Sequence, residues 1–92
     1  MKTLLETAKN LVKERWIKEA YWDTAGGYCM VGALNKAAVT TVAPYDTHVQ
    51  AIKQVAGVLG GDNEDDIIEF NDDDETTKEK VLEVFDKAIN SL

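Results

Sequence analysis

The amino-acid sequence predicts an all-α (mainly α) fold, a compact bundle of about four helices with a short hairpin or loop between the first two. Two observations lead to this prediction. Apolar residues recur every three to four positions in several segments, and stretches rich in glycine, proline or other turn-forming residues separate those segments. The chain has 92 residues, 45% of them hydrophobic, so a single helical domain over residues 1–92 with one core is expected.

The first helix is expected over residues 4–16, where an apolar stripe faces one side. Thr3 and Glu6 have the spacing of a capping box at its start. The helical period fails over residues 17–27, where aromatic residues and turn-forming residues follow one another. This segment is expected to form a short hairpin or an ordered loop with its aromatic side chains turned inward.

A second helix is expected from Tyr28 to about Val39, and its face of small residues, Gly32 among them, would let a neighbouring helix approach closely. It is therefore expected to be the central helix. A third helix, capped by Asp46 or Thr47, would stop at the glycine pair 60–61.

The last helix is expected to begin at Thr76 or Thr77, and Thr76 has the better capping box because Glu79 lies three residues later. The acidic stretch before it contains one apolar island around Ile67 and Phe70. This island should anchor the stretch to the core as a short turn of helix or an extended piece.

The net charge of −7 is concentrated between residues 62 and 75, which contain nine acidic residues and no base. We call this segment the acidic face. It would repel phosphate backbones and anionic lipid, so direct binding to nucleic acid or to a membrane is not expected. A basic protein surface is the expected partner, and the binding residues are expected to be Asp65, Asp66, Asp72, Asp73 and Asp74.

The remaining composition favours a cytoplasmic protein. No stretch approaches the roughly twenty apolar residues that span a bilayer, and the amino terminus does not resemble a signal peptide. A single cysteine forms no internal disulfide, so a reducing compartment is the default. A homo-oligomer is compatible with the sequence.

Cys29, His48 and Asn71 occur in the chain order of a papain-like catalytic set. Such enzymes need a cleft between two substantial lobes, which one small core does not provide. We therefore expect Cys29 to be a buried, unreactive core residue, His48 to face solvent or cap a helix, and no catalytic residue to be present.

The acidic stretch also resembles a calcium loop, because Asp62, Glu64 and Asp66 have the spacing of the first ligands of an EF-hand and Asp73 falls at the twelfth place. Ile67, however, occupies the sixth place, where the turn requires glycine. One cysteine and one histidine do not complete a zinc site either. No metal site and no cofactor are expected, and the acidic stretch is interpreted as a solvated surface.

Four aromatic residues crowd the region between the first two helices, namely Trp16, Tyr21, Trp22 and Tyr28. We expect them to be part of the core, because large aromatic side chains supply much of the buried area of a small domain. Two or more of them exposed beside Tyr45 would instead mark a recognition patch.

Three short segments resemble the pattern of a family of small uncharacterised bacterial and bacteriophage proteins: residues 28–37, residues 68–72, and Thr77 followed by Val81-Leu82. Members share a Cys-x-x-Gly-Ala-Leu helix and an aromatic-Asn-Asp, four-residue gap, Thr, Val-Leu pattern, with an aromatic residue after the first helix. The resemblance implies no activity and no catalytic residue. It singles out Trp16, Cys29, Gly32, Asn71, Asp72 and Thr77 as pattern positions.

The sequence thus favours a non-enzymatic accessory protein of bacterial or phage origin that binds another protein through the acidic face. One alternative is a DNA mimic whose carboxylates imitate phosphates and block a nucleic-acid-binding protein. Another is a small-ligand binder or an enzyme that uses Cys29 and Asn71, which requires both residues at a shared cleft.

Overall fold

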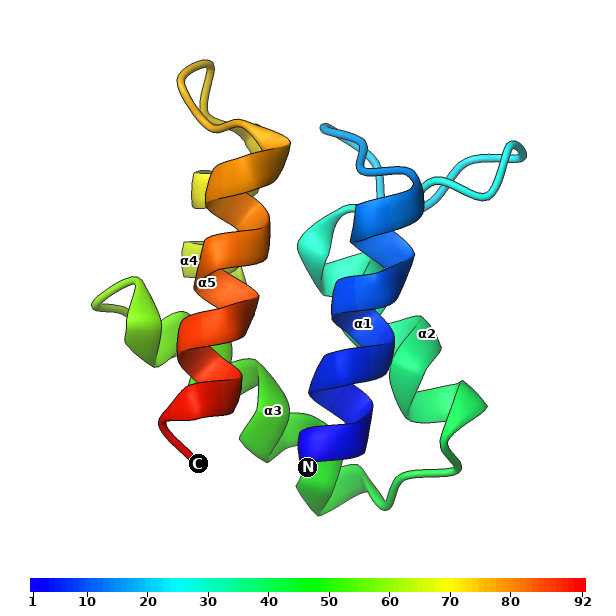
Figure 1. The fold of residues 1–92 in the computed structure, drawn as a ribbon, viewed down its shortest axis with the longest axis vertical. Coiled ribbons are helices and arrows are strands. Elements are labelled where there is room, and N and C mark those ends of the chain that lie inside the picture. The colour runs from blue at the N-terminus through cyan, green and yellow to red at the C-terminus, as the bar shows by residue number, and fades with distance from the viewer.

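The computed structural model describes all 92 residues and contains five α-helices and no β-strand (Figure 1). The helices are α1 (Lys2–Glu14), α2 (Met30–Thr40), α3 (Tyr45–Val58), α4 (Glu64–Asp72) and α5 (Lys78–Asn90). The predicted all-α class is confirmed. The predicted number of about four helices is one too few, because most of the acidic stretch forms α4.

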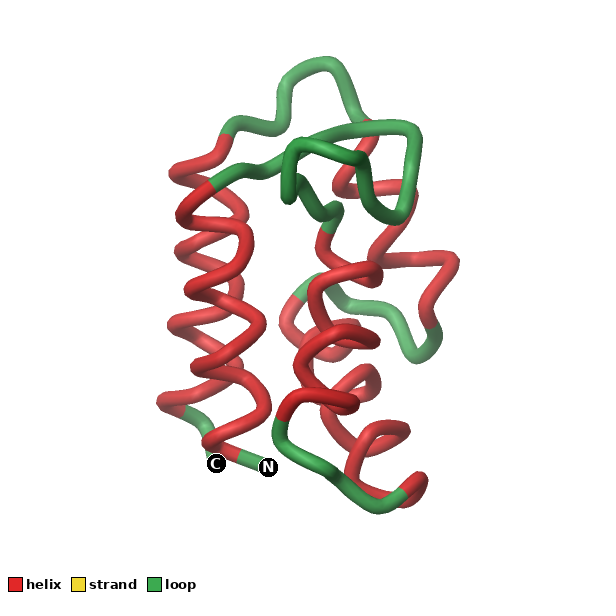
Figure 2. The backbone as a smooth tube through the Cα atoms, turned by 90° about the vertical axis from the view of Figure 1, so that its right-hand side faces the viewer, coloured by secondary structure: helices red, strands yellow, loops and turns green.

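The five helices are arranged in two layers, which Figure 2 shows side by side. Helices α1 and α5 run in opposite directions in one layer, and the other three helices lie behind them (Figure 1). Helix α2 packs against α1, α3 and α4, whereas α3 packs against all four other helices, so the predicted central place does not belong to α2 alone. The buried residues of α2 are Met30, Val31, Gly32, Ala33, Leu34, Ala37 and Ala38.

Helix α4 forms because a reciprocal capping box between Asn63 and Asp66 stabilises its first turn. The Asn63 side chain accepts hydrogen bonds from the backbone N–H groups of Asp65 and Asp66, and the Asp66 carboxylate accepts one from the N–H of Asn63. Ile67 is fully buried and anchors the helix to the core. The carboxylates of the first turn also interact favourably with the positive end of the helix dipole.

Two predicted caps near the amino-terminal half of the chain are wrong. Helix α1 begins at Lys2, so Thr3 already lies inside the helix, and Met1 at the N-cap makes no side-chain cap bond. Helix α3 begins directly after Pro44, which is the N-cap residue in place of Asp46 or Thr47. The predicted stop of α3 is confirmed, because Gly60 follows the helix with φ of 80°.

The cap of α5 is Thr77, whose side-chain oxygen accepts a hydrogen bond from the N–H of Lys80 at 3.3 Å. Thr76 had the better capping-box spacing in the sequence, but it is one of the few buried polar residues. The burial of Thr76 therefore takes precedence over its local preference for the cap position. None of the five helices combines the length and the apolar character that a bilayer crossing requires.

Candidate functional site

Residues 15–29, which we call the connecting loop, form an ordered loop without a strand. The N–H of Ile17 donates to the carbonyl of Tyr28 at 3.2 Å, and the N–H of Cys29 donates to the carbonyl of Tyr21 at 3.2 Å. Two isolated β-bridges join Tyr28 to Trp16 and to Trp22. Of the two predicted alternatives, the ordered loop is the one the structure contains.

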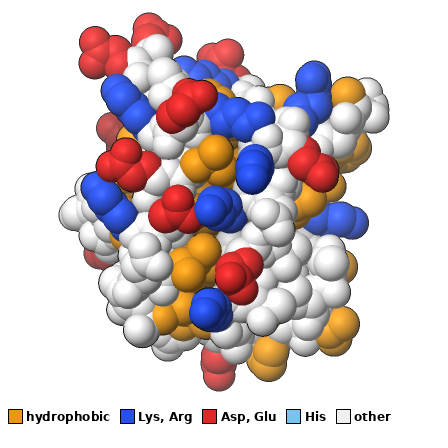
Figure 3. All heavy atoms as spheres, in the orientation of Figure 1, with side chains coloured by type: hydrophobic (Ala, Val, Ile, Leu, Met, Phe, Trp, Pro, Cys, Tyr) orange, Lys and Arg blue, Asp and Glu red, His pale blue; other side chains and the backbone are white.

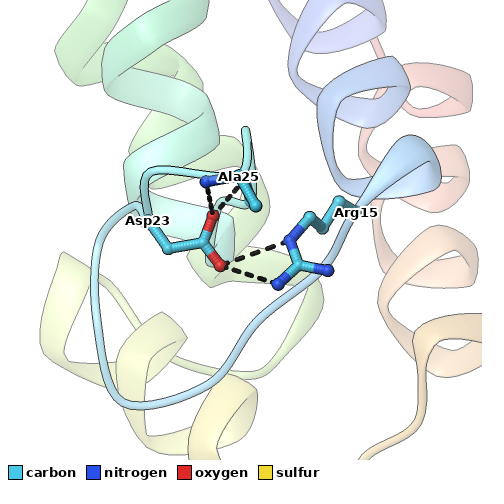
Figure 4. A network of polar contacts seen from close by, with 4 residues as sticks. Arg15, Asp23 and Ala25 are labelled. Carbon is cyan, nitrogen blue, oxygen red and sulfur yellow. Dashed lines mark hydrogen bonds and ion pairs between the residues drawn. The ribbon is translucent and has the colours of Figure 1, made fainter.

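An ion pair closes the tip of the connecting loop (Figure 4). Arg15 donates from Nε and Nη2 to Asp23 Oδ2 at 3.2 and 3.0 Å, while Asp23 Oδ1 accepts from the N–H groups of Ala25 and Gly27 at 3.0 and 2.7 Å. The hydrogen bond from Arg15, followed by the one from Gly27, lowers the pKa of Asp23. The carboxylate thus holds the turn at the tip and ties it to the end of α1.

Asn71, near the end of α4, joins three segments that are far apart in the sequence. Its Oδ1 accepts from Trp16 Nε1 at 2.6 Å and from the N–H of Met30 at 3.0 Å. Its Nδ2 donates to the carbonyl of Ile17 at 3.1 Å and to Asp72 Oδ1 at 2.9 Å. These four bonds use the full capacity of a side-chain amide, and no buried side-chain nitrogen or oxygen is left without a partner.

Gly32 is a close-packing site, but its partner is not a helix as the sequence suggested. A Cβ built on Gly32 would lie 1.8 Å from the carbonyl oxygen of Tyr21 and 2.7 Å from the carbonyl carbon. The connecting loop therefore crosses α2 with its backbone in direct contact. The prediction of a close approach is confirmed, and the predicted neighbour is wrong because the short loop, fixed by its bond to Cys29, covers this face.

The pattern positions are thereby brought together, with one exception. Trp16 and Asp72 bond directly to Asn71. Cys29 is the N-cap of α2, and its Sγ accepts from the N–H of Gly32 at 3.3 Å. Five of the six pattern positions thus surround the junction of the connecting loop, α2 and α4, whereas Thr77 caps α5 outside it.

Cys29 is buried, as predicted, with 5% of its surface exposed. Burial raises the pKa of its thiol, and the nearby charge of Asp72 acts in the same direction, so the neutral thiol is favoured. His48 lies on α3, where its Nε2 is 2.8 Å from Asn35 Oδ1. Cys29 and Asn71 line a shared pocket that His48 does not reach, so the papain-like set is not assembled.

The pocket shared by Cys29 and Asn71 lies between the connecting loop and α4, and we call it the junction pocket. Its volume is about 450 Å³. It is lined by Glu19, Ala20, Tyr21, Cys29, Ile68, Asn71 and Asp72. Glu19 was not predicted as a site residue, because no feature of the sequence signals its φ of 64°, a left-handed conformation that is uncommon for glutamate.

The acidic face contains carboxylates of two kinds. Asp66, Asp72 and Asp73 accept hydrogen bonds from backbone N–H groups, those of Asp62, Glu19 and Glu75 respectively. Asp65 and Asp74 are exposed and make no side-chain hydrogen bond. Figure 3 shows acidic side chains at the top of the molecule, over the turn between α4 and α5.

The EF-hand spacing in this stretch does not correspond to a calcium loop. Residues 64–72, which would form most of that loop, are helical. No group of three or more His, Cys, Asp or Glu side chains is arranged to hold a metal ion.

The aromatic residues of the connecting loop divide into two pairs. Trp16 and Tyr28 pack against the core, as predicted. Tyr21 and Trp22 are 51% and 63% exposed, so the prediction of a core role is wrong for them. They line a groove of about 310 Å³ together with Val39 on α2. Tyr45 is also exposed, but it does not line that groove.

The model of a family described as a family of unknown function (DUF6197) matches residues 1–91. No curated protein and no solved structure matches the chain. The predicted resemblance to an uncharacterised family is thereby confirmed.

Proposed function

The chain belongs to this family of unknown function, DUF6197, and because the family supplies no activity, we propose a function from the protein's own surface. The protein is a cytoplasmic, non-enzymatic accessory protein of bacterial or phage origin. It works by binding a partner protein that carries a basic surface, and the acidic face makes the contact.

The observation that carries this proposal is that no carboxylate of the acidic face forms an ion pair; the nearby Lys18 and Lys80 donate only to the backbone carbonyls of Asp73 and Glu75. The three ion pairs of the protein join Lys9 to Asp86, Arg15 to Asp23 and Lys87 to Glu83, all outside residues 62–75. The charge is also presented on an ordered element, since five of the nine acidic residues lie on α4. A fixed surface of one sign accelerates association with a surface of the opposite sign.

The arrangement of the reactive residues supports a non-enzymatic role. A thiol with a raised pKa is a poor nucleophile, and the one histidine is bonded to Asn35 away from the junction pocket. All four hydrogen-bonding positions of Asn71 are occupied within the fold. A nucleophile, a base and an orienting group in mutual contact are therefore missing.

The test neutralises only carboxylates of the acidic face that accept no hydrogen bond from a backbone N–H group. The quadruple variant changes Glu64→Gln, Asp65→Asn, Glu69→Gln and Asp74→Asn, all exposed positions without a side-chain hydrogen bond. A matched control removes the same charge elsewhere with Glu6→Gln, Glu14→Gln, Asp46→Asn and Glu79→Gln, which are also exposed. Both variants are compared with the unchanged protein in affinity capture from the native host at low and high salt.

We expect the unchanged protein and the control to capture the same proteins at low salt and to lose them at high salt. The acidic-face variant should capture them weakly at either salt concentration, mainly through slower association. Equal capture by the variant and the control would show that the acidic face serves only as a solubilising surface.

The ordered helix under the acidic face also favours the DNA-mimic function as a second candidate, because imitation of phosphates requires carboxylates on a rigid support. In that case the captured partner binds duplex DNA, and the unchanged protein displaces the DNA while the acidic-face variant does not. Simultaneous binding of the protein and duplex DNA to the partner would exclude mimicry.

A further inference from the structure

We propose that the junction pocket receives an arginine side chain of the partner protein and is the anchor point of the acidic-face contact. This inference rests on the proposed function, since it names the chemistry of the partner at the edge of the same surface. Asp72 belongs both to the acidic face and to the pocket lining, so the two are continuous.

The pocket has an apolar wall of suitable chemistry for the stem of a long side chain. Ala20, Cys29 and Ile68 line it, and the buried thiol of Cys29 is neutral. The volume of about 450 Å³ falls within the range of pockets that enclose a small ligand. The methylene groups of an arginine would lie along this wall while its charged end remains near the opening.

Two carboxylates supply the charge that a guanidinium requires. Asp72 Oδ1 is fixed by hydrogen bonds from Asn71 Nδ2 and from the N–H of Glu19, both at 2.9 Å, while its Oδ2 makes no hydrogen bond. The side chain of Glu19 is exposed and also makes none. The free carboxylate oxygens can accept N–H groups of one guanidinium in the planar geometry that arginine favours.

No cation of the protein itself occupies this place. Lysine and arginine are absent from the lining of the pocket. Lys18, next to Glu19 in the sequence, donates its Nζ to the carbonyl of Asp73 and lies over the Trp16 ring at 5.4 Å, so it forms no ion pair with either carboxylate. The negative charge of the pocket is therefore available to a partner.

Tyr21 distinguishes arginine from lysine at this site. Half of its surface is exposed, and it lines the pocket beside the two carboxylates. A guanidinium can stack on the face of an aromatic ring and still donate hydrogen bonds in its own plane, which an ammonium group cannot do.

The left-handed backbone of Glu19 fixes the geometry of this end of the pocket. Its φ of 64° turns the backbone so that the N–H reaches Asp72, and the bond between them holds the two acidic residues side by side. Strained backbone of this kind is commonly retained where a side chain must be placed for binding.

The test uses N-acetyl-arginine amide as the probe and follows the amide resonances of Glu19, Tyr21 and Ile68 by NMR titration. We expect shift changes confined to the pocket. N-acetyl-citrulline amide has the same shape without the charge, and its initial slope of shift change against probe concentration should be about tenfold smaller than that of the arginine probe. The slope for N-acetyl-lysine amide should also be smaller, but by a lesser factor. Equal slopes for the arginine and citrulline probes would overturn the proposal.

Two variants locate the binding. Glu19→Gln and Asp72→Asn each remove one charge. The asparagine introduced by Asp72→Asn keeps an oxygen that can accept the hydrogen bonds from Asn71 and Glu19. Each variant should reduce the slope for the arginine probe about tenfold. Glu14→Gln, an exposed glutamate at the end of α1, is the matched control and should leave the slope unchanged. An unchanged slope in both pocket variants would also overturn the proposal.

The two proposals fail separately. If the arginine probe does not bind, but the acidic-face variant still captures less protein from the host, the arginine pocket is refuted and the proposed function stands. If the probe binds in the pocket, but neutralising the acidic face leaves capture unchanged, the proposal that the acidic face contacts the partner is refuted.

Discussion

Asn71 is a single buried side chain, 1% exposed, that sets the position of three backbone segments. A carboxamide is the one uncharged side chain that offers two donors and two acceptors within so short a reach. A carboxylate would place an acceptor against the carbonyl of Ile17 and beside the charge of Asp72. The hydrogen-bonding groups around this position therefore account for the choice of asparagine.

The first prediction concerns this residue. Asn71→Leu has a similar volume but leaves the indole N–H of Trp16, the N–H of Met30 and the carbonyl of Ile17 without their partner. We expect a loss of about 2–4 kcal/mol in the free energy of unfolding, measured by urea denaturation followed by circular dichroism. Asn10→Leu, an exposed substitution on α1, should change it by less than about 0.5 kcal/mol. A loss below about 1 kcal/mol at Asn71 would contradict the structural role.

At the level of the element, α2 and the connecting loop act as one unit, because the loop backbone lies against the helix at Gly32. The sequence indicated that a close approach occurs here, since a helix-interior glycine is unfavourable without a reason. The helix that it suggested as the approaching element was the wrong one, because the backbone of Tyr21 in the connecting loop makes the contact. Hydrophobic periodicity describes the face of a helix, but it carries no information about a loop that makes contact through its backbone atoms.

The second prediction contrasts two glycines inside helices. Gly32→Ala would place a methyl group into the carbonyl of Tyr21, so the loop must move, and we expect a loss of about 1–3 kcal/mol in the free energy of unfolding. Gly57→Ala on α3 meets no atom within 4 Å and should raise the stability by up to about 1 kcal/mol. Thermal and urea unfolding of both variants would measure this. A stabilising Gly32→Ala would exclude the close contact.

The helices differed in how well the sequence predicted them. The stripes of α1, α3 and α5 bury apolar residues at regular spacing, so their existence followed from the pattern. Helix α4 fully buries only Ile67 and Asn71, and its surface is dominated by charge. Its helical state depends on the Asn63 capping box and on tertiary contacts, which periodicity does not register.

At the level of the whole molecule, the junction could not have been predicted from the sequence. Trp16 and Asn71 are 55 positions apart, and their hydrogen bond joins the connecting loop to α4. The sequence singled out Cys29 and Asn71 as positions of the family pattern. That they meet at one pocket, with Glu19 and Tyr21 on its lining, depends on the path of the connecting loop.

The third prediction concerns global stability at alkaline pH. Burial raises the pKa of the Cys29 thiol, so the unfolded chain releases this proton at lower pH than the folded protein. The free energy of unfolding should therefore fall as the pH rises above about 8.5, by up to about 1.4 kcal/mol per pH unit from this group. Cys29→Ser keeps an acceptor at the N-cap and removes the titration.

Urea unfolding of both proteins between about pH 7 and 10 would measure this difference, since the two proteins differ only at residue 29. We expect the stability of the unchanged protein to fall more steeply than that of Cys29→Ser. Parallel curves would mean that the thiol ionises as readily in the folded protein as in the unfolded chain.

The two chain ends emerge from the molecule at the same end in Figures 1 and 2, whereas the connecting loop and the α4–α5 turn lie at the other. An affinity tag or a linker to a solid support, attached at either end, would therefore hold the protein with its junction pocket directed into solution. Amino-terminal and carboxy-terminal tags should retrieve the same partners. A protein retrieved with only one of the two tags would be identified as a contact of the tagged end.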